Sequence, residues 1–166
     1  RVISKGSGNW FEIFAIDKGS KDGIKKDMNV IADNGLVGIV YDVTENTAKV
    51  RTIINDTSMV SAMFQETTDQ CIVRGSLDTM ADGYLEVVYI DKDADVKDGD
   101  ELVTSNISSK FNEGITIGKV SDIKLDSTKL TKTARVTPVV DFKHLKEVLV
   151  ITDIKNTESL DTETKE

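Results

Sequence analysis

The feature that most constrains the fold is the spacing of the apolar residues, which recur with a period of two almost throughout the chain. These runs are rich in Val, Ile, Thr and Tyr, and Asp-Gly pairs, Asn-Gly pairs or Asn/Asp clusters separate them. Such runs are typical of β-strands, and such pairs are typical of turns. The strand-like runs are 30–32, 36–43, 47–54, 60–64, 70–74, 84–90, 101–104, 115–125, 132–140 and 148–152. The sequence therefore predicts an all-β fold, built as small barrels or a sandwich.

Three local patterns add detail to this prediction. The segment Asp141–Glu147 alone fits a short helical turn, with its Phe and Leu facing inward. The Asn34-Gly35 pair lies between two strand-like runs, as in a two-residue hairpin. Pro138, the only proline, lies in a Val-rich run. We expect its strand at a sheet edge or at a bulge, where a missing N–H is tolerated.

A weak internal repeat predicts two related β modules. The first copy covers residues 16–43 and the second covers residues 90–123. Each copy runs from an Asp-Lys turn through a charged loop and a short strand to a long strand that contains glycine. Glycine within a strand relieves crowding at a bulge or a sharp corner. The alternative explanation is that acidic β turns simply resemble one another.

The charge balance argues against one class of function. The chain carries 29 acidic and 21 basic residues, a net charge of −8, and it has no basic run. Nucleic-acid binding depends on Lys and Arg side chains that neutralise phosphates. Anionic membrane surfaces likewise attract basic segments and repel acidic ones. We therefore expect no nucleic-acid partner and no direct binding to an anionic membrane surface.

The two ends of the chain also carry information. The chain begins at Arg1, and its apolar stretches are far shorter than the roughly 18 residues that a membrane-spanning helix needs. We interpret the chain as part of a longer protein, in which any anchor or export signal lies upstream. The acidic tail, residues 153–166, loses the apolar periodicity, and we expect it to be disordered.

Two motifs resemble catalytic sequences but lack their context. Ser121 and Lys124 match the Ser-x-x-Lys pattern of penicillin-binding proteins, where the lysine lies one helical turn from the serine. The alternating segment here predicts a strand, which would place the two side chains on opposite faces. Asp56 and Asp78 each precede a threonine, as in an aspartic-protease loop, but turn chemistry explains both better. We therefore expect no catalytic residue.

The metal-binding residue types are equally sparse. Asp91, Asp93 and Asp95 have the spacing of a calcium loop, but the glycine and glutamate that an EF-hand requires are missing. A solvated turn is the favoured interpretation. His144 is the only histidine and Cys71 the only cysteine, so ordinary ligands cannot assemble a zinc site. We expect no metal or cofactor, a buried structural cysteine and an exposed histidine.

Several short motifs, taken in order, resemble the MreC family of rod shape-determining proteins. The matching segments are 9–11, 16–26, 35–40, 73–75, 85–87, 90–100, 102–105, 111–120 and 141–151. No single motif is specific, but their order and spacing together are, and they cover nearly the whole folded part. The chain departs from the family pattern at Asn106, Ser108 and Ser109, where glycines are expected after Thr-Ser.

The resemblance implies a fold and a location. It implies two small antiparallel six-stranded-type β-barrels, with the second inserted in the first. Residues 1–57 and 121–152 would form the first barrel, residues 58–120 the second, and residues 153–166 the disordered acidic tail. The parent protein would be anchored in the cell membrane. Its membrane helix and coiled coil would lie upstream of Arg1, so this region would be extracytoplasmic and would contact the membrane only through that helix.

The resemblance also implies a function. The chain would be a non-catalytic scaffold of the bacterial rod (elongasome) complex, which maintains cell shape by binding and activating peptidoglycan synthases outside the membrane. The implied partners are a class B penicillin-binding transpeptidase, MreD, MreB and other rod-complex proteins, together with self-association. No cofactor is implied. We expect the second barrel to carry much of the partner surface.

Two alternative functions stay open. A peptidoglycan hydrolase would need a convergent set of titratable groups, and only carboxylates are available in number. A carbohydrate-binding module of the wall would need a row of exposed aromatic side chains, and only 5% of the residues are aromatic. Trp10, Phe11 and Phe14 are expected to belong to the core of the first barrel rather than to a sugar-stacking platform.

Overall fold

The structure is a computed structural model that describes residues 1–6 and 8–155. Twelve strands make up nearly all of its regular structure, together with a 3-10 turn, η1 (Ser20–Asp22), and a four-residue helix, α1 (Leu77–Met80). The prediction of an all-β fold is therefore confirmed. The disorder expected in the acidic tail concerns mainly residues 156–166, which lie outside the described residues.

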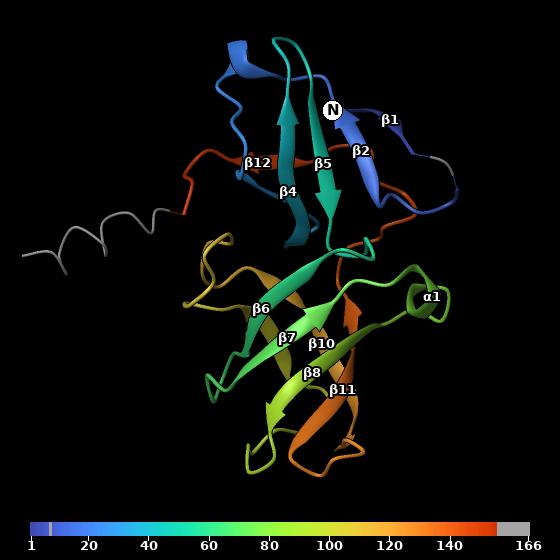
Figure 1. Cartoon of the computed structure of the whole chain (residues 1–166). Helices are drawn as coiled ribbons and strands as arrows, with labels where there is room; N and C mark the ends of the chain where they lie inside the picture. Colours follow the sequence, from blue (N-terminus) through green and yellow to red (C-terminus); the bar gives the residue numbers. More distant parts are fainter. Residues whose placement is uncertain (7, 156–166) are drawn as a thin grey trace, which may run out of the picture.

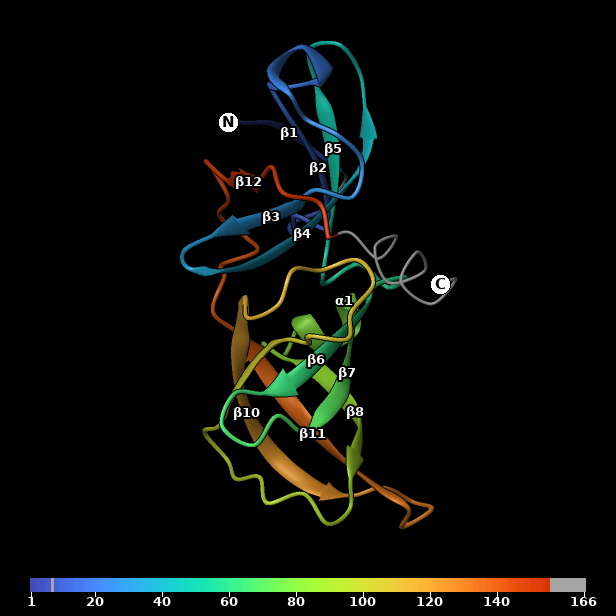
Figure 2. The ribbon, with the colours of Figure 1, turned by 90° about the vertical axis from the view of Figure 1, so that its left-hand side faces the viewer.

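The first unit is a six-stranded antiparallel sheet that curls into a half-barrel (Figures 1 and 2). We call it the curled sheet. Its strands are β1 (Val2–Lys5), β2 (Ile13–Ile16), β3 (Asn29–Ala32), β4 (Gly35–Val43), β5 (Ala48–Thr52) and β12 (Leu149–Ile151). They pair in the order β1-β2-β5-β4-β3-β12, so β1 and β12 form its two edges.

The second unit is a closed barrel of six strands. Its strands are β6 (Met59–Phe64), β7 (Gln70–Arg74), β8 (Leu85–Asp91), β9 (Glu101–Thr104), β10 (Thr116–Leu125) and β11 (Thr131–Pro138). They pair around the ring in the order β10-β11-β8-β7-β6-β9. The chain leaves the curled sheet after β5, builds the barrel, and returns to pair β12 with β3. The predicted insertion of the second unit in the first is confirmed.

The strand pairing moves one boundary that the sequence suggested. Residues 121–152 were expected in the first unit, but β10 continues to Leu125, and β11 pairs with both β10 and β8. The ring closes only because β11 fills the place between β10 and β8, so residues 121–138 lie in the barrel. Pro138 ends β11 beyond Val136, the last residue that pairs with β8. Its missing N–H therefore leaves the β8–β11 ladder intact.

The two repeated segments share a pairing geometry. β3 pairs with β4 in the first, β9 pairs with β10 in the second, and each pair contains one register shift. A Cβ atom on Gly38 would lie 2.7 Å from the Cα of Thr52, and one on Gly118 would lie 2.8 Å from the carbonyl carbon of Thr137. Both glycines are required because the backbone of the next strand passes too close for a side chain.

The hairpin between β3 and β4 is confirmed, with its turn one residue earlier than expected. Asp33 and Asn34 form the turn with φ angles of 52° and 65°. Positive φ at both positions is typical of the two-residue turns that match the twist of paired strands. Gly35 then begins β4, and a Cβ there would lie 2.9 Å from Cγ2 of Val140. The returning chain thus packs directly on this hairpin.

The core of the curled sheet contains the aromatic residues that the sequence assigned to it. Phe14 is buried, and the half-buried Trp10 and Phe11 pack against the same core. Phe142 and Leu145 are also buried, as predicted. Their segment contains a turn, but it does not form the helical turn that the sequence predicted. Its two apolar side chains nevertheless anchor the chain between β11 and β12.

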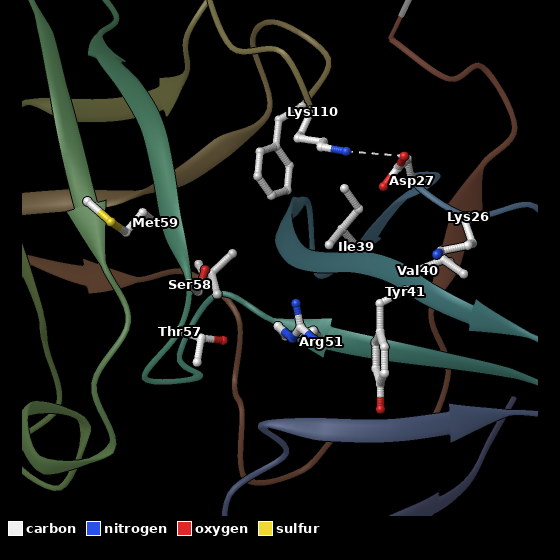
Figure 3. A pocket seen from close by; sticks show the side chains of 12 residues that line it. Lys26, Asp27, Ile39, Val40, Tyr41, Arg51, Thr57, Ser58, Met59 and Lys110 are labelled. Carbon is white, nitrogen blue, oxygen red and sulfur yellow. Dashed lines mark hydrogen bonds and ion pairs between the residues drawn. The ribbon is translucent and has the colours of Figure 1, made fainter.

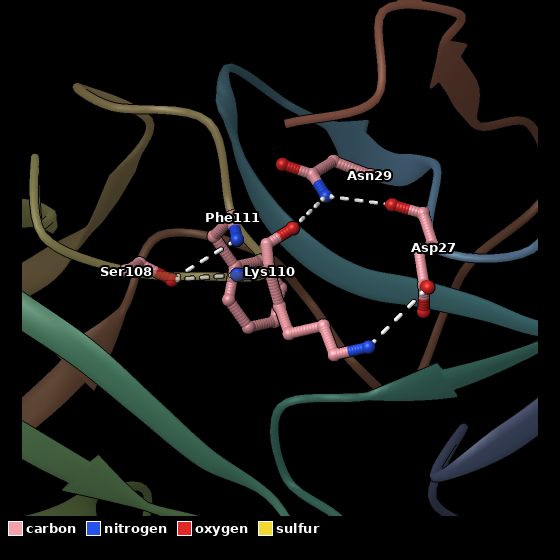
Figure 4. A network of polar contacts seen from close by, with 5 residues as sticks. All are labelled: Asp27, Asn29, Ser108, Lys110 and Phe111. Atoms are coloured by element: carbon pink, nitrogen blue, oxygen red, sulfur yellow. Dashed lines mark hydrogen bonds and ion pairs between the residues drawn. The ribbon is translucent and has the colours of Figure 1, made fainter. Parts of the chain in front are cut away.

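A polar network joins the curled sheet to the loop between β9 and β10, residues 105–115 (Figure 4). Asn29 at the start of β3 is fully buried. Its amide group donates to the carbonyl oxygen of Lys110 at 3.0 Å, and its oxygen accepts from the N–H of Asn112 at 2.8 Å. The Lys110 ammonium lies 3.3 Å from the Asp27 carboxylate. Two hydrogen bonds to the buried Asn29 side chain and one exposed ion pair therefore join the two units.

Candidate partner-binding surface

Strands β6, β7 and β8 lie side by side on one side of the barrel (Figure 1). Their register aligns Val60, Val73 and Val87 in one row, and all three are fully buried in the core. Because side chains alternate along a strand, the intervening positions face outward. Met63 on β6 and Val88 on β8 occupy outward positions but are buried. The accessible outward positions are Met59 and Ser61 on β6, Gln70, Ile72 and Arg74 on β7, and Glu86 on β8. We call these positions, together with Tyr89, the β6–β8 face.

A bulge in β8 gives this face its most unusual residue. The β8–β11 register skips one position, so that Val88 and Tyr89 together oppose Thr133. Tyr89 has a φ angle of +62°, a left-handed conformation that is strained for an aromatic residue. The residue as a whole is 55% exposed. The bulge therefore holds an aromatic ring outside the core at a cost in backbone free energy.

Arg74 on the neighbouring strand holds the Tyr89 ring in place. The guanidinium carbon lies 5.7 Å from the ring centroid, and a guanidinium N–H donates to the phenol oxygen at 3.3 Å. Met59, which pairs with Arg74 across the strands, is 57% exposed. Exposed Tyr, Arg and Met side chains are enriched at protein interfaces. This end of the face has the composition of a protein-binding surface.

The loop of residues 105–115 borders the other end of the β6–β8 face. The Gln70 side chain is hydrogen-bonded to the Ser105 hydroxyl, and its amide donates to the Asn106 side chain at 3.2 Å. Ile107, the next residue, is 68% exposed. Since Gln70 pairs with Met63, the loop adds an apolar side chain beside this strand pair. Apolar groups at both ends of the face are available for contact with another protein.

The Ser-x-x-Lys motif lies on the outside of the barrel in a geometry that differs from the prediction. A register shift within β10, where Asp122 has a φ of +54°, adds one residue between Ser121 and Lys124. Both side chains are consequently exposed, rather than on opposite faces. The Lys124 ammonium lies 3.7 Å from the Asp122 carboxylate. A lysine paired with a carboxylate on a strand does not reproduce the helical arrangement of the acyl-enzyme motif.

The aspartates that resemble catalytic or calcium-binding residues lie in or beside turns, or in the short helix α1. Asp56 accepts a hydrogen bond from the Leu77 N–H at the start of α1, at 3.0 Å, and Asp78 lies within that helix. Asp91 accepts from the Asp93 N–H at 2.8 Å. The Asp91 bond is local, as in an Asx turn, whereas the Asp56 bond connects a turn to the start of α1. Within residues 1–6 and 8–155, no three His, Cys, Asp or Glu residues are grouped closely enough to hold a metal ion.

The single histidine and the single cysteine lie where the sequence predicted. His144 is exposed, with its Nδ1 2.8 Å from Oδ2 of Asp141. That contact, followed by the hydrogen bond from the Lys143 N–H, lowers the pKa of the Asp141 carboxyl. Cys71 pairs with Ala62 in the barrel core and is only 4% exposed. Burial, with a smaller contribution from Asp69, raises the pKa of the Cys71 thiol to about 12.

Cys71 is expected to resist thiol reagents in the folded protein. With a pKa of about 12, the thiolate makes up on the order of one part in ten thousand at pH 8, and the thiolate is the reactive species. Reaction with Ellman's reagent should therefore be complete only in guanidinium chloride. Rapid stoichiometric reaction in native buffer would contradict the placement of this thiol in the barrel core.

Tyr89 was missed by the sequence interpretation, although the sequence carries a signal for it. Residues 87–90 are four consecutive apolar or aromatic residues, and such a break in alternation is typical of a bulge. The run alone does not show that the extra residue would turn the following tyrosine outward. That consequence depends on pairing with β11, which is distant in the sequence.

The fold defines a class of all-β proteins in which a six-stranded barrel is inserted into a curled six-stranded sheet. The sequence profile described as "Rod shape-determining protein MreC, barrel core" matches residues 2–152. The chain is 33% identical over 152 residues to the cell shape-determining protein MreC of Listeria monocytogenes, covering 90% of this chain and 51% of that protein. The chain therefore belongs to the MreC family of cell shape-determining proteins.

Solved structures agree with this assignment. The MreC structure from Listeria monocytogenes has a TM-score of 0.83 at 33% identity, over 94% of this chain and 76% of that one. A complex between the penicillin-binding protein PBP2 and MreC from Helicobacter pylori matches with a TM-score of 0.64 at 17% identity, covering 90% and 92%, and shows the fold alone. The chain spans about half the length of the curated relatives it matches. In the described part of this chain, no helix is long and apolar enough to cross a membrane.

Proposed function

We propose that this chain is the extracytoplasmic, non-catalytic part of a membrane-anchored scaffold in the bacterial rod (elongasome) complex. Its role is to bind and activate a peptidoglycan synthase outside the membrane. The observation that carries the proposal is that the chain belongs to the MreC family. Its barrel also presents the exposed Tyr89 ring, held by Arg74, as an anchor for a partner. A scaffold of this kind raises the active population of a synthase by binding its active conformation more tightly.

The proposed synthase is a class B penicillin-binding transpeptidase, which would dock on the β6–β8 face. A relative from Helicobacter pylori forms a complex with PBP2, which supports this choice of partner. Tyr89 supplies a ring held by Arg74, so little side-chain freedom is lost when it binds. Met59 beside them supplies an adaptable apolar contact.

The wider assembly is part of the same proposal. MreD and MreB would join the complex through parts of the parent protein, and an upstream helix would make its only membrane contact. Self-association would use the β12 edge of the curled sheet, which has one side without a neighbouring strand in the described sheet. The β1 edge is partly occupied, because the Val2 N–H donates to the Lys146 carbonyl oxygen at 3.0 Å. Strand addition at an open edge is a common mode of protein association.

Tyr89→Ala is expected to weaken binding to the purified extracytoplasmic part of the elongation transpeptidase from the same organism about tenfold or more. Removing an anchored aromatic residue from the centre of an interface commonly costs about 2 kcal/mol. Tyr84→Ala is the matched control, because Tyr84 lies just before β8, is half-buried, and has the guanidinium carbon of Arg135 on β11 4.3 Å from its ring centroid. Surface plasmon resonance with both variants measures the difference.

Two outcomes would contradict the proposal. Equal loss of affinity in both tyrosine variants would show that the β6–β8 face is not the docking surface. Recovery of no wall-synthesis protein from a membrane extract, together with measurable hydrolysis of peptidoglycan by the purified chain, would favour a hydrolase instead of a scaffold.

A further inference from the structure

A cleft of about 410 Å³ lies where the curled sheet meets the barrel (Figure 3). β4 and β5 form its wall on the side of the curled sheet. The linker before β6 and the loop of residues 105–115 form the opposite wall. The cleft is distinct from the β6–β8 face, with which it shares only Met59.

The cleft carries positive charge in an acidic protein. Lys26, Arg51 and Lys110 line it, with Asp27 as the only carboxylate. Asp27 is paired with Lys110 at 3.3 Å, and no carboxylate in the described part of the chain lies within ion-pair distance of Lys26 or Arg51. Three cations and one carboxylate leave a local charge of +2, against −8 for the whole chain. At physiological ionic strength the Debye length is about 8 Å, so the local charge decides what the cleft attracts.

Arg51 is oriented to bind a carboxylate. Its guanidinium carbon lies 4.8 Å from the centroid of the Tyr41 ring, and the side chain is half-buried. Stacking on a ring fixes the guanidinium and leaves its N–H groups free to donate. Within the described residues, those N–H groups have no hydrogen-bond acceptor. A guanidinium of this kind binds carboxylates through two parallel hydrogen bonds.

Apolar side chains line the same cleft beside the cations. Ile39 pairs with Arg51 across β4 and β5, and Phe111 covers the cleft from the barrel loop. Figure 3 shows Ile39 and Arg51 on neighbouring strands below the Lys110 side chain. Small anions and polyanions gain nothing from such a lining. A peptide in which carboxylates alternate with apolar side chains satisfies both parts of it.

We propose that this cleft binds an acidic, partly apolar peptide segment of a protein partner, with Arg51 and Lys26 holding its carboxylates. The inference is separate from the proposed synthase contact, because it concerns another surface and does not depend on which protein supplies the segment. The junction would then bind a ligand as well as join the two units, because a peptide in the cleft contacts both of them.

The test uses a fluorescein-labelled peptide in which glutamate alternates with leucine and phenylalanine, and a second peptide with glutamine in place of glutamate. Fluorescence anisotropy measures binding to the full chain and to three variants. Arg51→Gln and Lys26→Gln each remove one charge from the cleft. Lys49→Gln removes the same charge two residues before Arg51 on β5, on the same face but outside the cleft.

We expect the parent chain to bind the glutamate peptide and not the glutamine peptide. Relative to the parent chain, the affinity for the glutamate peptide should fall at least tenfold in Arg51→Gln and several-fold in Lys26→Gln. In Lys49→Gln it should stay within twofold of the parent affinity. Lys26 is exposed, so its variant tests the cleft even if Arg51→Gln disturbs the Tyr41 stack. The proposal is overturned if the glutamate peptide does not bind. Equal loss in all three variants, or full displacement by millimolar inorganic phosphate, also overturns it, because either result shows a general anion effect.

Discussion

Gly38→Ala is expected to lower the free energy of unfolding of the curled sheet by about 3 kcal/mol or more. The new methyl group would lie 2.7 Å from the Cα of Thr52 and would also collide with the carbonyl group of Arg51. Overpacking typically costs about 1–3 kcal/mol when side chains adjust, and here only backbone atoms of the adjacent strand could move. β4 is a central strand, so such a movement would disturb its pairing with both β3 and β5.

Trp10 allows this effect to be measured in the curled sheet alone. It is the only tryptophan, and it packs against the core of that unit with the Lys143 ammonium 4.7 Å from its ring centroid. Its fluorescence in a urea titration therefore reports the unit that contains Gly38. Gly6→Ala is the control, because its Cβ would meet only the Ile13 oxygen at an ordinary 3.7 Å. If both variants unfold at the same urea concentration, the close approach of β4 and β5 does not require glycine at position 38.

Asn29→Leu is expected to release the loop of residues 105–115 from the curled sheet and to cost about 2–3 kcal/mol. Leucine fills a similar volume but leaves the Lys110 carbonyl and the Asn112 N–H without their partner. Leaving a buried polar group unsatisfied costs about 1–3 kcal/mol. The loss should appear in the Trp10 urea titration.

Hydrogen exchange then locates the effect of Asn29→Leu. The Asn112 amide should exchange much faster in the variant, while amides in the paired strands β6 and β7 keep their protection. Asn46→Leu, at an exposed position, serves as the matched control and should leave both regions unchanged. Unaltered exchange at Asn112 would show that Asn29 does not hold the two units together.

Local patterns in the sequence predicted much of the fold. The alternation of apolar residues identified most of the strands, and Asn34-Gly35 predicted the hairpin, although its turn lies one residue earlier. Cys71 was correctly placed in a core. Each of these features depends on residues within a few positions of one another. The assignment of β11 to the barrel could not be predicted in this way, since it depends on which distant strands pair.

The candidate surfaces were harder to predict for the same reason. Asn29 is a polar residue within the otherwise apolar run from Met28 to Ile31, which is a sequence signal for a buried polar contact. Its partners are more than eighty residues away, so the sequence does not identify them. The charged cleft likewise combines side chains from both units. Only the assembled fold brings Arg51 near Lys110.

The insertion of the barrel between β5 and β12 also sets an order of events during synthesis. β3 is made early, but its edge partner β12 is the last of the twelve described strands to leave the ribosome. Until then the polar backbone edge of β3 stays open, while residues 59–138 supply all six strands that the barrel needs for closure. An open strand edge is a template for aggregation, so the nascent chain passes through a vulnerable interval that ends only when β12 arrives.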